Sequence, residues 1–322
     1  MKYPARNNLI CNYDFVPLLN KDIQKFNDDT FAYEGKFELE LIAEAPVYVG
    51  SGKETVVGGR LCRALIRNAN GVPVIPGSSL KGVVRTIAQA VSNSGGCAEA
   101  PYIRKEEIKY PSNRNCKCLV CTMLGSLSAK SRVTFSDFTA SDSDTPNLSD
   151  ASNTPNKYDT SDTLVLNALK PYSHDVLDVK TKYFINNRPK GIKFYSQGDA
   201  NKIQGEVPTE CVAAGTGFVG EIIFQGLTET HLELLCFALG LDDSFPLRVG
   251  GNKPGFFGVV RPKIISFACY LSGTYRNLKL ELPQSRQIID MDPVNLAKAY
   301  VNKNPQIKSN IDKLRQILNR KV

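Results

Sequence analysis

The chain has 322 residues, of which 42% are hydrophobic and 22% are charged, and its formal net charge is +8. No apolar run approaches the roughly 18 residues of a membrane span, and MKYPARNNLICNYDF at the N-terminus lacks the apolar stretch of an export signal. The composition excludes an integral membrane protein and predicts a soluble globular protein of the cytoplasm. The positive charge adds a moderate bias toward polyanionic partners such as nucleic acids.

The first strongly patterned segment, residues 31–45, predicts a half-buried strand. Phe37, Leu39 and Leu41 alternate there with charged residues, which is the period of a strand with one buried face. A glycine-rich turn, VGSGKETVVGGR at 49–60, separates it from a second extended segment, LCRALIRN, which NANG closes as a turn.

IPGSSLKGVVR, residues 75–85, predicts the start of a helix. The apolar residues that follow it have the i, i+3, i+4 spacing of one helix face, and Lys81 and Arg85 fall outside that stripe. A helix start of this kind presents backbone N–H groups, the hydroxyls of Ser78 and Ser79 and the positive end of the helix dipole. It is therefore either an ordinary capped helix or a place that binds a phosphate.

Residues 92–130 contain a cysteine cluster that predicts a structural zinc site. CKCLVC places a CxC and a CxxC in one short segment, so that four thiolates can enclose one tetrahedral ion and leave no open position for catalysis. The four predicted ligands are Cys97, Cys116, Cys118 and Cys121. Buried free cysteines, or a site completed by His174, are the alternatives.

The amino-acid composition changes twice in the middle of the chain. SRVTFSDFTA, residues 131–140, predicts a strand, and the Ser-, Asp- and Asn-rich residues 141–163 predict a mobile loop. From 178 to 204 lysines and arginines stand among aromatic residues, and INNRPKG has the composition of a hairpin tip.

The C-terminal part adds two strands and further helices. Residues 217–227 predict a strand, Thr228 is the expected N-cap of the helix that follows, and a second glycine-rich loop, RVGGNKPGFFG, leads into a strand at 259–271. Basic helices are expected over 290–322. The resulting order suits an α+β fold with a β-α-β-β-α-β core, although periodicity alone allows other α+β arrangements.

Catalytic signals are weak. GSGKE at 50–54 is similar to the end of the phosphate-binding loop GxxxxGK[ST], but the first glycine would fall at Val47 and the hydroxyl residue at Glu54, which disfavours an ATPase. A loop that lets the backbone approach a phosphodiester and a plain turn both stay open. His174 and His231 have no nucleophile motif around them, so an ordinary polar role is expected for both.

Five motifs in a fixed order carry a resemblance to a known family. VYVGSG, IPGSSLKG, CLVCTMLG, SRVTFSD and VGGNKPGFFG together resemble the RAMP superfamily (repeat-associated mysterious proteins), specifically the backbone-type subunits of type III CRISPR-Cas effector complexes. The match spans residues 36–262. It implies a single RAMP domain over 1–322, with insertions at 92–130 and 139–204 and a helical extension at 290–322.

The resemblance implies a modified ferredoxin-like or RRM-like palm that grips the CRISPR RNA backbone, and a hairpin thumb that interrupts guide–target pairing. The implied partners are CRISPR RNA, target RNA, other RAMP subunits and the large subunit of the complex. The basic and aromatic residues of 180–195 suit the thumb, because lysines follow phosphates while aromatic rings stack on displaced bases.

Many subunits of this kind cut target RNA with an aspartate between the first two motifs. The corresponding position here is Cys62 in RLCRALIR, and residues 31–135 contain no aspartate. The resemblance therefore implies a non-catalytic RNA-binding subunit. The alternative is an endoribonuclease, either a target cutter with an acid such as Asp159 or a transcript-processing enzyme with His174 or His231 as its base.

The sequence and the resemblance together give one set of RNA-binding candidates, all glycine-rich, basic, hydroxyl-bearing or aromatic. They are Gly50, Ser51, Gly52, Lys53, Ser78, Ser79, Lys81, Arg85, Lys190, Lys193, Tyr195, Arg248, Gly250, Gly251, Lys253, Gly255 and Gly258.

Overall fold

The computed structural model describes residues 12–18, 26, 32–92, 102–104, 107–109, 116–141, 163–170, 176–271 and 288–322. Cys97, Asp159 and His174 lie outside these ranges, as does most of the loop expected at 141–163. In the described part of the chain no helix is long and apolar enough to cross a membrane.

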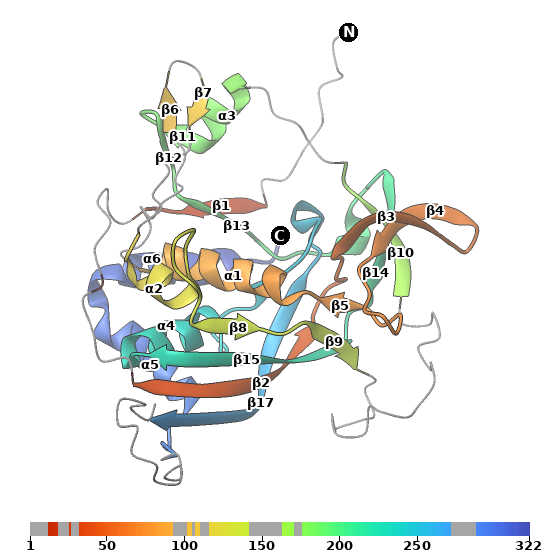
Figure 1. Ribbon diagram of the computed structural model, residues 1–322. Helices are drawn as coiled ribbons and strands as arrows, with labels where there is room; N and C mark the ends of the chain where they lie inside the picture. Colours follow the sequence, from red (N-terminus) through yellow and green to blue (C-terminus); the bar gives the residue numbers. More distant parts are fainter. Residues whose placement is uncertain are drawn as a thin grey trace.

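A seven-stranded antiparallel sheet forms the centre of the fold (Figure 1). Its main path runs β16-β17-β2-β15-β9-β5, and β8 pairs with β15 beside β9. The strands are β2 (Tyr33–Ala43), β5 (Val74–Ile75), β8 (Val133–Phe135), β9 (Phe138–Ser141), β15 (Gly217–Leu227), β16 (Leu247–Arg248) and β17 (Val259–Leu271). The molecule is thus a mixed α/β protein, in agreement with the expected α+β class.

The two faces of the central sheet follow from the period-2 pattern in β2. Phe37, Leu39 and Leu41 are fully buried, whereas Lys36 on the opposite face forms an ion pair with Glu221 of β15 at 2.6 Å. Successive side chains of a strand point to opposite faces, so one face is apolar and covered while the other is charged. The strand predicted at 31–45 is confirmed.

Helices cover the apolar face of the sheet, with α1 and α4 packed against each other (Figure 1). They are α1 (Gly77–Ala90), α2 (Leu119–Leu124), α4 (Glu229–Ala238), α5 (Pro293–Lys303) and α6 (Lys308–Asn319), and the short 3-10 turns are η3 (Ala200–Lys202), η4 (Lys253–Gly255) and η5 (Pro305–Ile307). Leu80, Val84 and Ile87 of α1 lie in the core, as their helical spacing predicted. Thr228 caps α4 as expected, because its hydroxyl accepts from the His231 N–H.

A second, four-stranded sheet has the order β10-β14-β4-β3. Its strands are β3 (Gly50–Val57), β4 (Arg60–Leu65), β10 (Thr163–Ala168) and β14 (Val207–Val212). The prediction of a glycine-rich turn over the whole of 49–60 is wrong, because most of that segment is β3. The pairing with β4 shifts between Gly50 and Glu54, so the first glycines form a bulge, and only Gly58 and Gly59, with φ of 54° and 75°, make the turn.

The remaining described elements form three two-stranded sheets and one short helix outside the two larger sheets. β1 (Tyr13–Val16) pairs with β13 (Ile192–Tyr195), and α3 (Val176–Tyr183) leads into the hairpin of β11 (Phe184–Ile185) and β12 (Arg188–Pro189). The hairpin tip predicted in INNRPKG is confirmed at Asn186 and Asn187, which have φ of 50° and 61°. β6 (Tyr102–Arg104) and β7 (Glu107–Lys109) form a further pair. The strand predicted at 131–140 is divided into β8 and β9, and the helices expected over 290–322 are α5 and α6.

Candidate functional site

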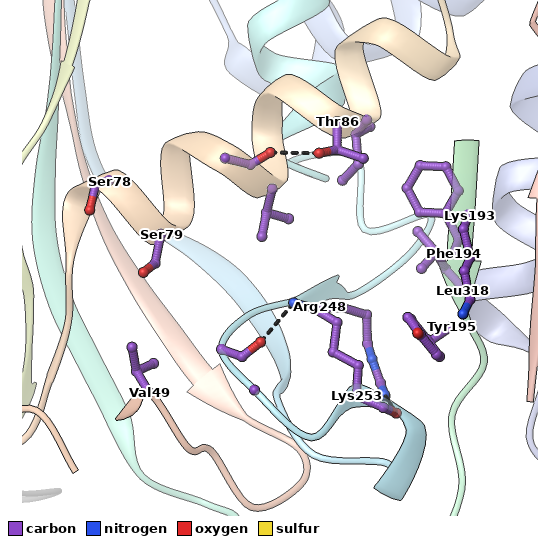
Figure 2. Close-up of a pocket in the computed structure, with 15 residues that line it drawn as sticks. Val49, Ser78, Ser79, Thr86, Lys193, Phe194, Tyr195, Arg248, Lys253 and Leu318 are labelled. Carbon is purple, nitrogen blue, oxygen red and sulfur yellow. Dashed lines mark hydrogen bonds between the residues drawn. The ribbon is translucent and has the colours of Figure 1, made fainter. Parts of the chain in front are cut away.

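Three segments that lie far apart in the sequence line one pocket of about 590 Å³ (Figure 2). The first turns of α1, strand β13 and the loop after β16 form its walls. Eight of the predicted RNA-binding residues meet there, namely Ser78, Ser79, Lys193, Tyr195, Arg248, Gly250, Gly251 and Lys253. Apolar side chains such as Val83, Phe194 and Leu318 complete the lining.

Two glycines of the loop between β16 and β17 are required by backbone geometry. Gly250 has φ of 71°, and a Cβ there would collide with the backbone oxygen of Tyr48, which also accepts from the Gly251 N–H at 2.7 Å. Gly258 has φ of 80°, and its Cβ would meet the oxygen of Val249. Only glycine combines a left-handed conformation with so close an approach of two backbones, so the loop is fixed in place.

Arg248 forms a buried part of the pocket wall. Arg248 is 5% exposed, and its Nη2 donates to the carbonyl oxygen of Lys253 at 2.8 Å. The Nε and Nη1 atoms are buried and have no hydrogen-bond partner among the described residues. Burial lowers the pKa of Arg248 to about 10, because the charged form has lost its hydration.

Lys253 lies next to Arg248, and Figure 2 shows the two side chains extended beside Tyr195. The Lys253 Nζ donates to the carbonyl oxygen of Gly250 at 2.7 Å. Burial, followed by the positive charge of Arg248, lowers the pKa of Lys253 to about 8. Among the described residues that line the pocket there is no aspartate or glutamate, so the site combines desolvation with unbalanced positive charge.

Lys193 lies within a group of tyrosine rings at the edge of the pocket. Its Nζ is 3.9 Å from the ring centre of Tyr13, 4.6 Å from that of Tyr195 and 5.0 Å from that of Tyr183. It also donates to the Tyr183 hydroxyl at 3.3 Å. Cation–π interactions with the three rings therefore hold the Lys193 ammonium in this position. Tyr183 belongs to the basic and aromatic segment 180–195 that the sequence assigned to the thumb, whereas Tyr13 was not predicted as a site residue, and the β1–β13 pairing brings it here.

Several predicted RNA-binding residues lie away from the pocket. Arg85 donates through Nη2 to the carbonyl oxygens of Leu124 and Gly125 at 2.8 and 2.7 Å, which fixes it to the end of α2. Lys81 is half-buried, and burial together with the charge of Arg85 lowers its pKa. The remaining predicted residues outside the lining are Gly50, Ser51, Gly52 and Lys53 in β3, Lys190 beside the β11–β12 hairpin, and Gly255 and Gly258 in the loop.

The N-terminus of α1 is already paired with a carboxylate. The Gly77 N–H donates to Asp137 Oδ1 at 2.9 Å, and Asp137 lies between β8 and β9 in the motif SRVTFSD. A negative charge at the N-terminus stabilises a helix, because it faces the positive end of the helix dipole. The motif pair IPGSSLKG and SRVTFSD therefore forms one structural contact, which the sequence analysis did not anticipate.

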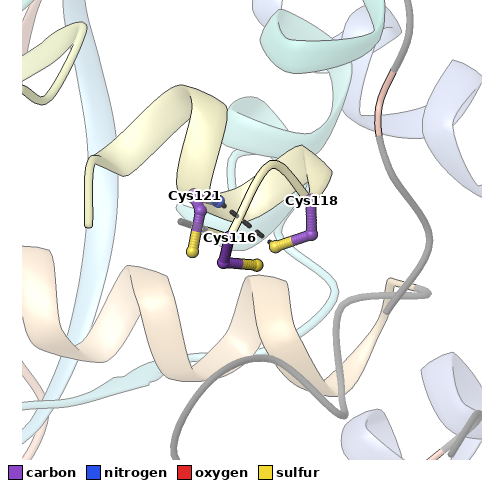
Figure 3. Close-up of side chains that lie close together, drawn as sticks. All are labelled: Cys116, Cys118 and Cys121. Carbon is purple, nitrogen blue, oxygen red and sulfur yellow. Dashed lines mark hydrogen bonds between the residues drawn. The ribbon is translucent and has the colours of Figure 1, made fainter. Parts of the chain in front are cut away.

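Three of the four predicted zinc ligands come together at the start of α2 (Figure 3). The Sγ atoms of Cys116, Cys118 and Cys121 all lie within 4.8 Å of one another, and the three residues are buried. Four sulfur ligands around zinc stand about 3.8 Å apart at a Zn–S length of about 2.3 Å, so the set fits a zinc ion after a small contraction. The Cys121 N–H donates to Cys118 Sγ at 3.4 Å, a bond that suits a thiolate ligand.

A model of the RAMP superfamily matches residues 40–261, which is more than half of the chain. The chain belongs to the RAMP superfamily. Membership implies CRISPR-associated RNA binding, and the three clustered cysteines and all residues that line the pocket except Leu318 lie within the matched range. A search of curated proteins found no match.

In this RAMP protein, Cys62 is held inside the fold. It is 2% exposed in β4, its Sγ donates to the Thr55 oxygen at 3.6 Å, and burial raises its pKa. The nearby buried carboxylate of Glu210 is engaged, because Oε1 pairs with Arg67 at 2.6 Å and Oε2 accepts from the Leu65 N–H at 2.9 Å. Both side chains are therefore buried and engaged within the fold.

His231 has a structural role in this RAMP protein. It is fully buried, its Nε2 lies 2.9 Å from the Thr122 hydroxyl and its Nδ1 lies 2.9 Å from the Thr228 hydroxyl. Both ring nitrogens thus serve the contact between α2 and the start of α4. A general base must reach its substrate, and this imidazole does not.

Proposed function

We propose that this RAMP protein is a structural, RNA-binding subunit of a type III CRISPR-Cas effector complex. It would hold CRISPR RNA by its backbone and position target RNA without cutting it. The observation that carries the proposal is the pocket, where three segments of the RAMP-matched region place buried positive charge with no carboxylate in the described lining. Such a site favours a polyanion and gives sequence-independent, salt-sensitive binding.

The central sheet supports a ferredoxin-like palm. The strands follow the order β17-β2-β15-β9, with α1 between β2 and β8 in the chain and α4 between β15 and β17. This order supports the proposed β-α-β-β-α-β core, with β8 and β9 together as its second strand. The palm would present the loop after β16 and the start of α1 to the RNA.

The β11–β12 hairpin is the proposed thumb. Lys182, Ile185 and Arg188 are exposed on or next to it, so that basic and apolar groups face solvent together. A hairpin with this surface can contact phosphates and displaced bases. Neighbouring RAMP subunits and the large subunit of the complex are the proposed protein partners.

A zinc ion held by Cys97 and the three clustered cysteines is proposed as a structural group. Four thiolates close the coordination sphere, so the ion would fix the segment before α2 against the core without taking part in a reaction. The buried set of Cys116, Cys118 and Cys121 supports this assignment.

The absence of cutting is supported by Cys62, which offers a buried thiol where a carboxylate is expected in a cutting subunit. The test uses the complex purified through this subunit, with target RNA complementary to its guide and Mg²⁺. Guide RNA should copurify and the target should remain intact. Target fragments at regular spacing would refute the non-cutting role, and a complex without guide RNA would refute RNA binding itself.

A further inference from the structure

The pocket separates into an apolar wall and a cationic wall. Val83 and Ile87 of α1 contribute to the first, and Lys193, Arg248 and Lys253 to the second. The ammonium of Lys193 already faces the three tyrosine rings described above. The charge that remains to be balanced in the pocket is therefore concentrated at Arg248 and Lys253.

Arg248 and Lys253 differ in what they can touch. Both residues line the pocket, but Arg248 is buried, and its Nε and Nη1 atoms have no hydrogen-bond partner within the described ranges. Lys253 is half-buried, and its Nζ is held by one neutral carbonyl, that of Gly250. Arg248 also holds the backbone oxygen of Lys253 from behind. Lys253 is thus the more exposed of the two cations, and Arg248 supports its backbone.

Two adjacent buried cations without a counter-ion destabilise each other. An anion that enters the pocket relieves this repulsion and restores the electrostatic balance that hydration would otherwise supply. A phosphate group is the anion of this size that an RNA-binding subunit meets, and an ammonium is suited to it as a compact point charge.

We propose that Lys253 contacts a backbone phosphate of the bound RNA in this pocket, and that Arg248 is the positioning residue behind it. This assignment rests on the proposed function and names the side chain that contacts the RNA. It also predicts that RNA affinity depends on pH. Because the pKa of Lys253 is lowered to about 8 in the free protein, phosphate binding requires the protein to take up a proton above that pH.

RNA affinity should fall as the pH rises, because only the protonated form of Lys253 attracts the phosphate. Affinity is fully present below the free-state pKa of Lys253 and is lost as the pH rises through it. Burial raises the pKa of Tyr48, Tyr195 and Cys211 around the loop, so these three groups stay neutral in this range. Arg248, with a pKa of about 10, stays charged.

The test is the affinity of the full-length protein for a labelled single-stranded RNA, measured by fluorescence anisotropy at constant ionic strength. With a pKa of about 8, about a tenth of Lys253 is protonated at pH 9, so affinity should fall about tenfold between pH 7 and pH 9. Lys253→Arg keeps its charge throughout and should retain affinity while losing the pH step. Lys253→Met should lose both the step and at least about tenfold of the affinity at pH 7, because it is permanently neutral.

Arg248→Gln separates positioning from simple structural support. Removing the charge of Arg248 raises the pKa of Lys253, so the pH step should move to higher pH while the thermal midpoint and the affinity at pH 7 are retained. Lost packing would also hydrate Lys253 and raise its pKa, but it would lower both the thermal midpoint and the affinity at pH 7. Lys298→Met, which changes an exposed lysine on α5, is the matched control and should reproduce the wild-type profile.

A wild-type affinity that does not change between pH 7 and pH 9 would overturn the assignment, as would a Lys253→Arg protein with the wild-type step. Both results would leave RNA binding by the subunit in place. A wild-type protein that binds no RNA at pH 7 would instead refute the proposed function. If Arg248→Gln fails to fold, as judged by circular dichroism, the Lys253→Arg profile decides alone.

Discussion

Replacing Gly250 by alanine tests whether the loop after β16 is fixed by its contact with Tyr48. The matched control is Gly215→Ala, because Gly215 also has a positive φ, 96°, but has no atom within 4 Å of the position of an added Cβ. Both substitutions place alanine in a left-handed conformation, which costs about 1 kcal/mol. Only Gly250→Ala also drives a Cβ into the Tyr48 oxygen.

The additional cost at Gly250 has two physical sources. The Tyr48 carbonyl must move away, which weakens its hydrogen bond from the Gly251 N–H at a cost of about 1 kcal/mol. The shift of packed backbone around it adds about 1 kcal/mol or more. Gly250→Ala should therefore lower the free energy of unfolding by about 3 kcal/mol, against about 1 kcal/mol for Gly215→Ala.

Chemical denaturation followed by circular dichroism gives both free energies, and RNA anisotropy at pH 7 gives the functional effect. RNA affinity should fall for Gly250→Ala, since its carbonyl holds the Lys253 ammonium, and should be unchanged for Gly215→Ala. Free energies of unfolding that agree within about 0.5 kcal/mol for the two variants would show that the close approach to Tyr48 does not constrain the loop.

Three further substitutions test the other assignments. Cys118→Ser should remove bound zinc and lower the thermal midpoint, as a chelator should in the wild type, and wild-type protein that carries no zinc by mass spectrometry would contradict the metal site. Arg85→Met should cost about 2 kcal/mol of stability, because the Leu124 carbonyl loses a charged donor, yet leave RNA affinity unchanged; a several-fold weaker affinity would return Arg85 to the RNA contact. Asp137→Ala should cost about 1 kcal/mol by leaving the Gly77 N–H and the helix dipole without an anion, and unchanged denaturation would show that this contact contributes nothing.

The main strands and helices around the central sheet could be predicted because their signals are local. The alternation of Phe37, Leu39 and Leu41 marks β2, and the spacing of Leu80 and Val84 marks α1. Burial of one face imposes a period of 2 on a strand and 3.6 on a helix, so a sequence read alone reports both. The order of five short motifs likewise indicated the RAMP superfamily, which the match over 40–261 confirms.

The extent of the first glycine-rich segment could not be predicted in the same way. GSGK has the composition of a turn, but pairing with β4 draws it into β3 as a bulge. Cross-strand hydrogen bonds decide this outcome, and their partners are not encoded within the segment itself.

For the candidate site, the sequence by itself determined which residue types were available: basic, glycine-rich and cysteine-rich segments whose chemistry suits phosphates and zinc. Only the tertiary structure decided how they are used. It turned Arg85 toward α2, placed Asp137 on the N-terminus of α1, and brought Lys253 into the pocket with the buried Arg248 behind it. Charge, desolvation and hydrogen-bond partners depend on neighbours distant in the chain, and only the folded protein supplies those neighbours.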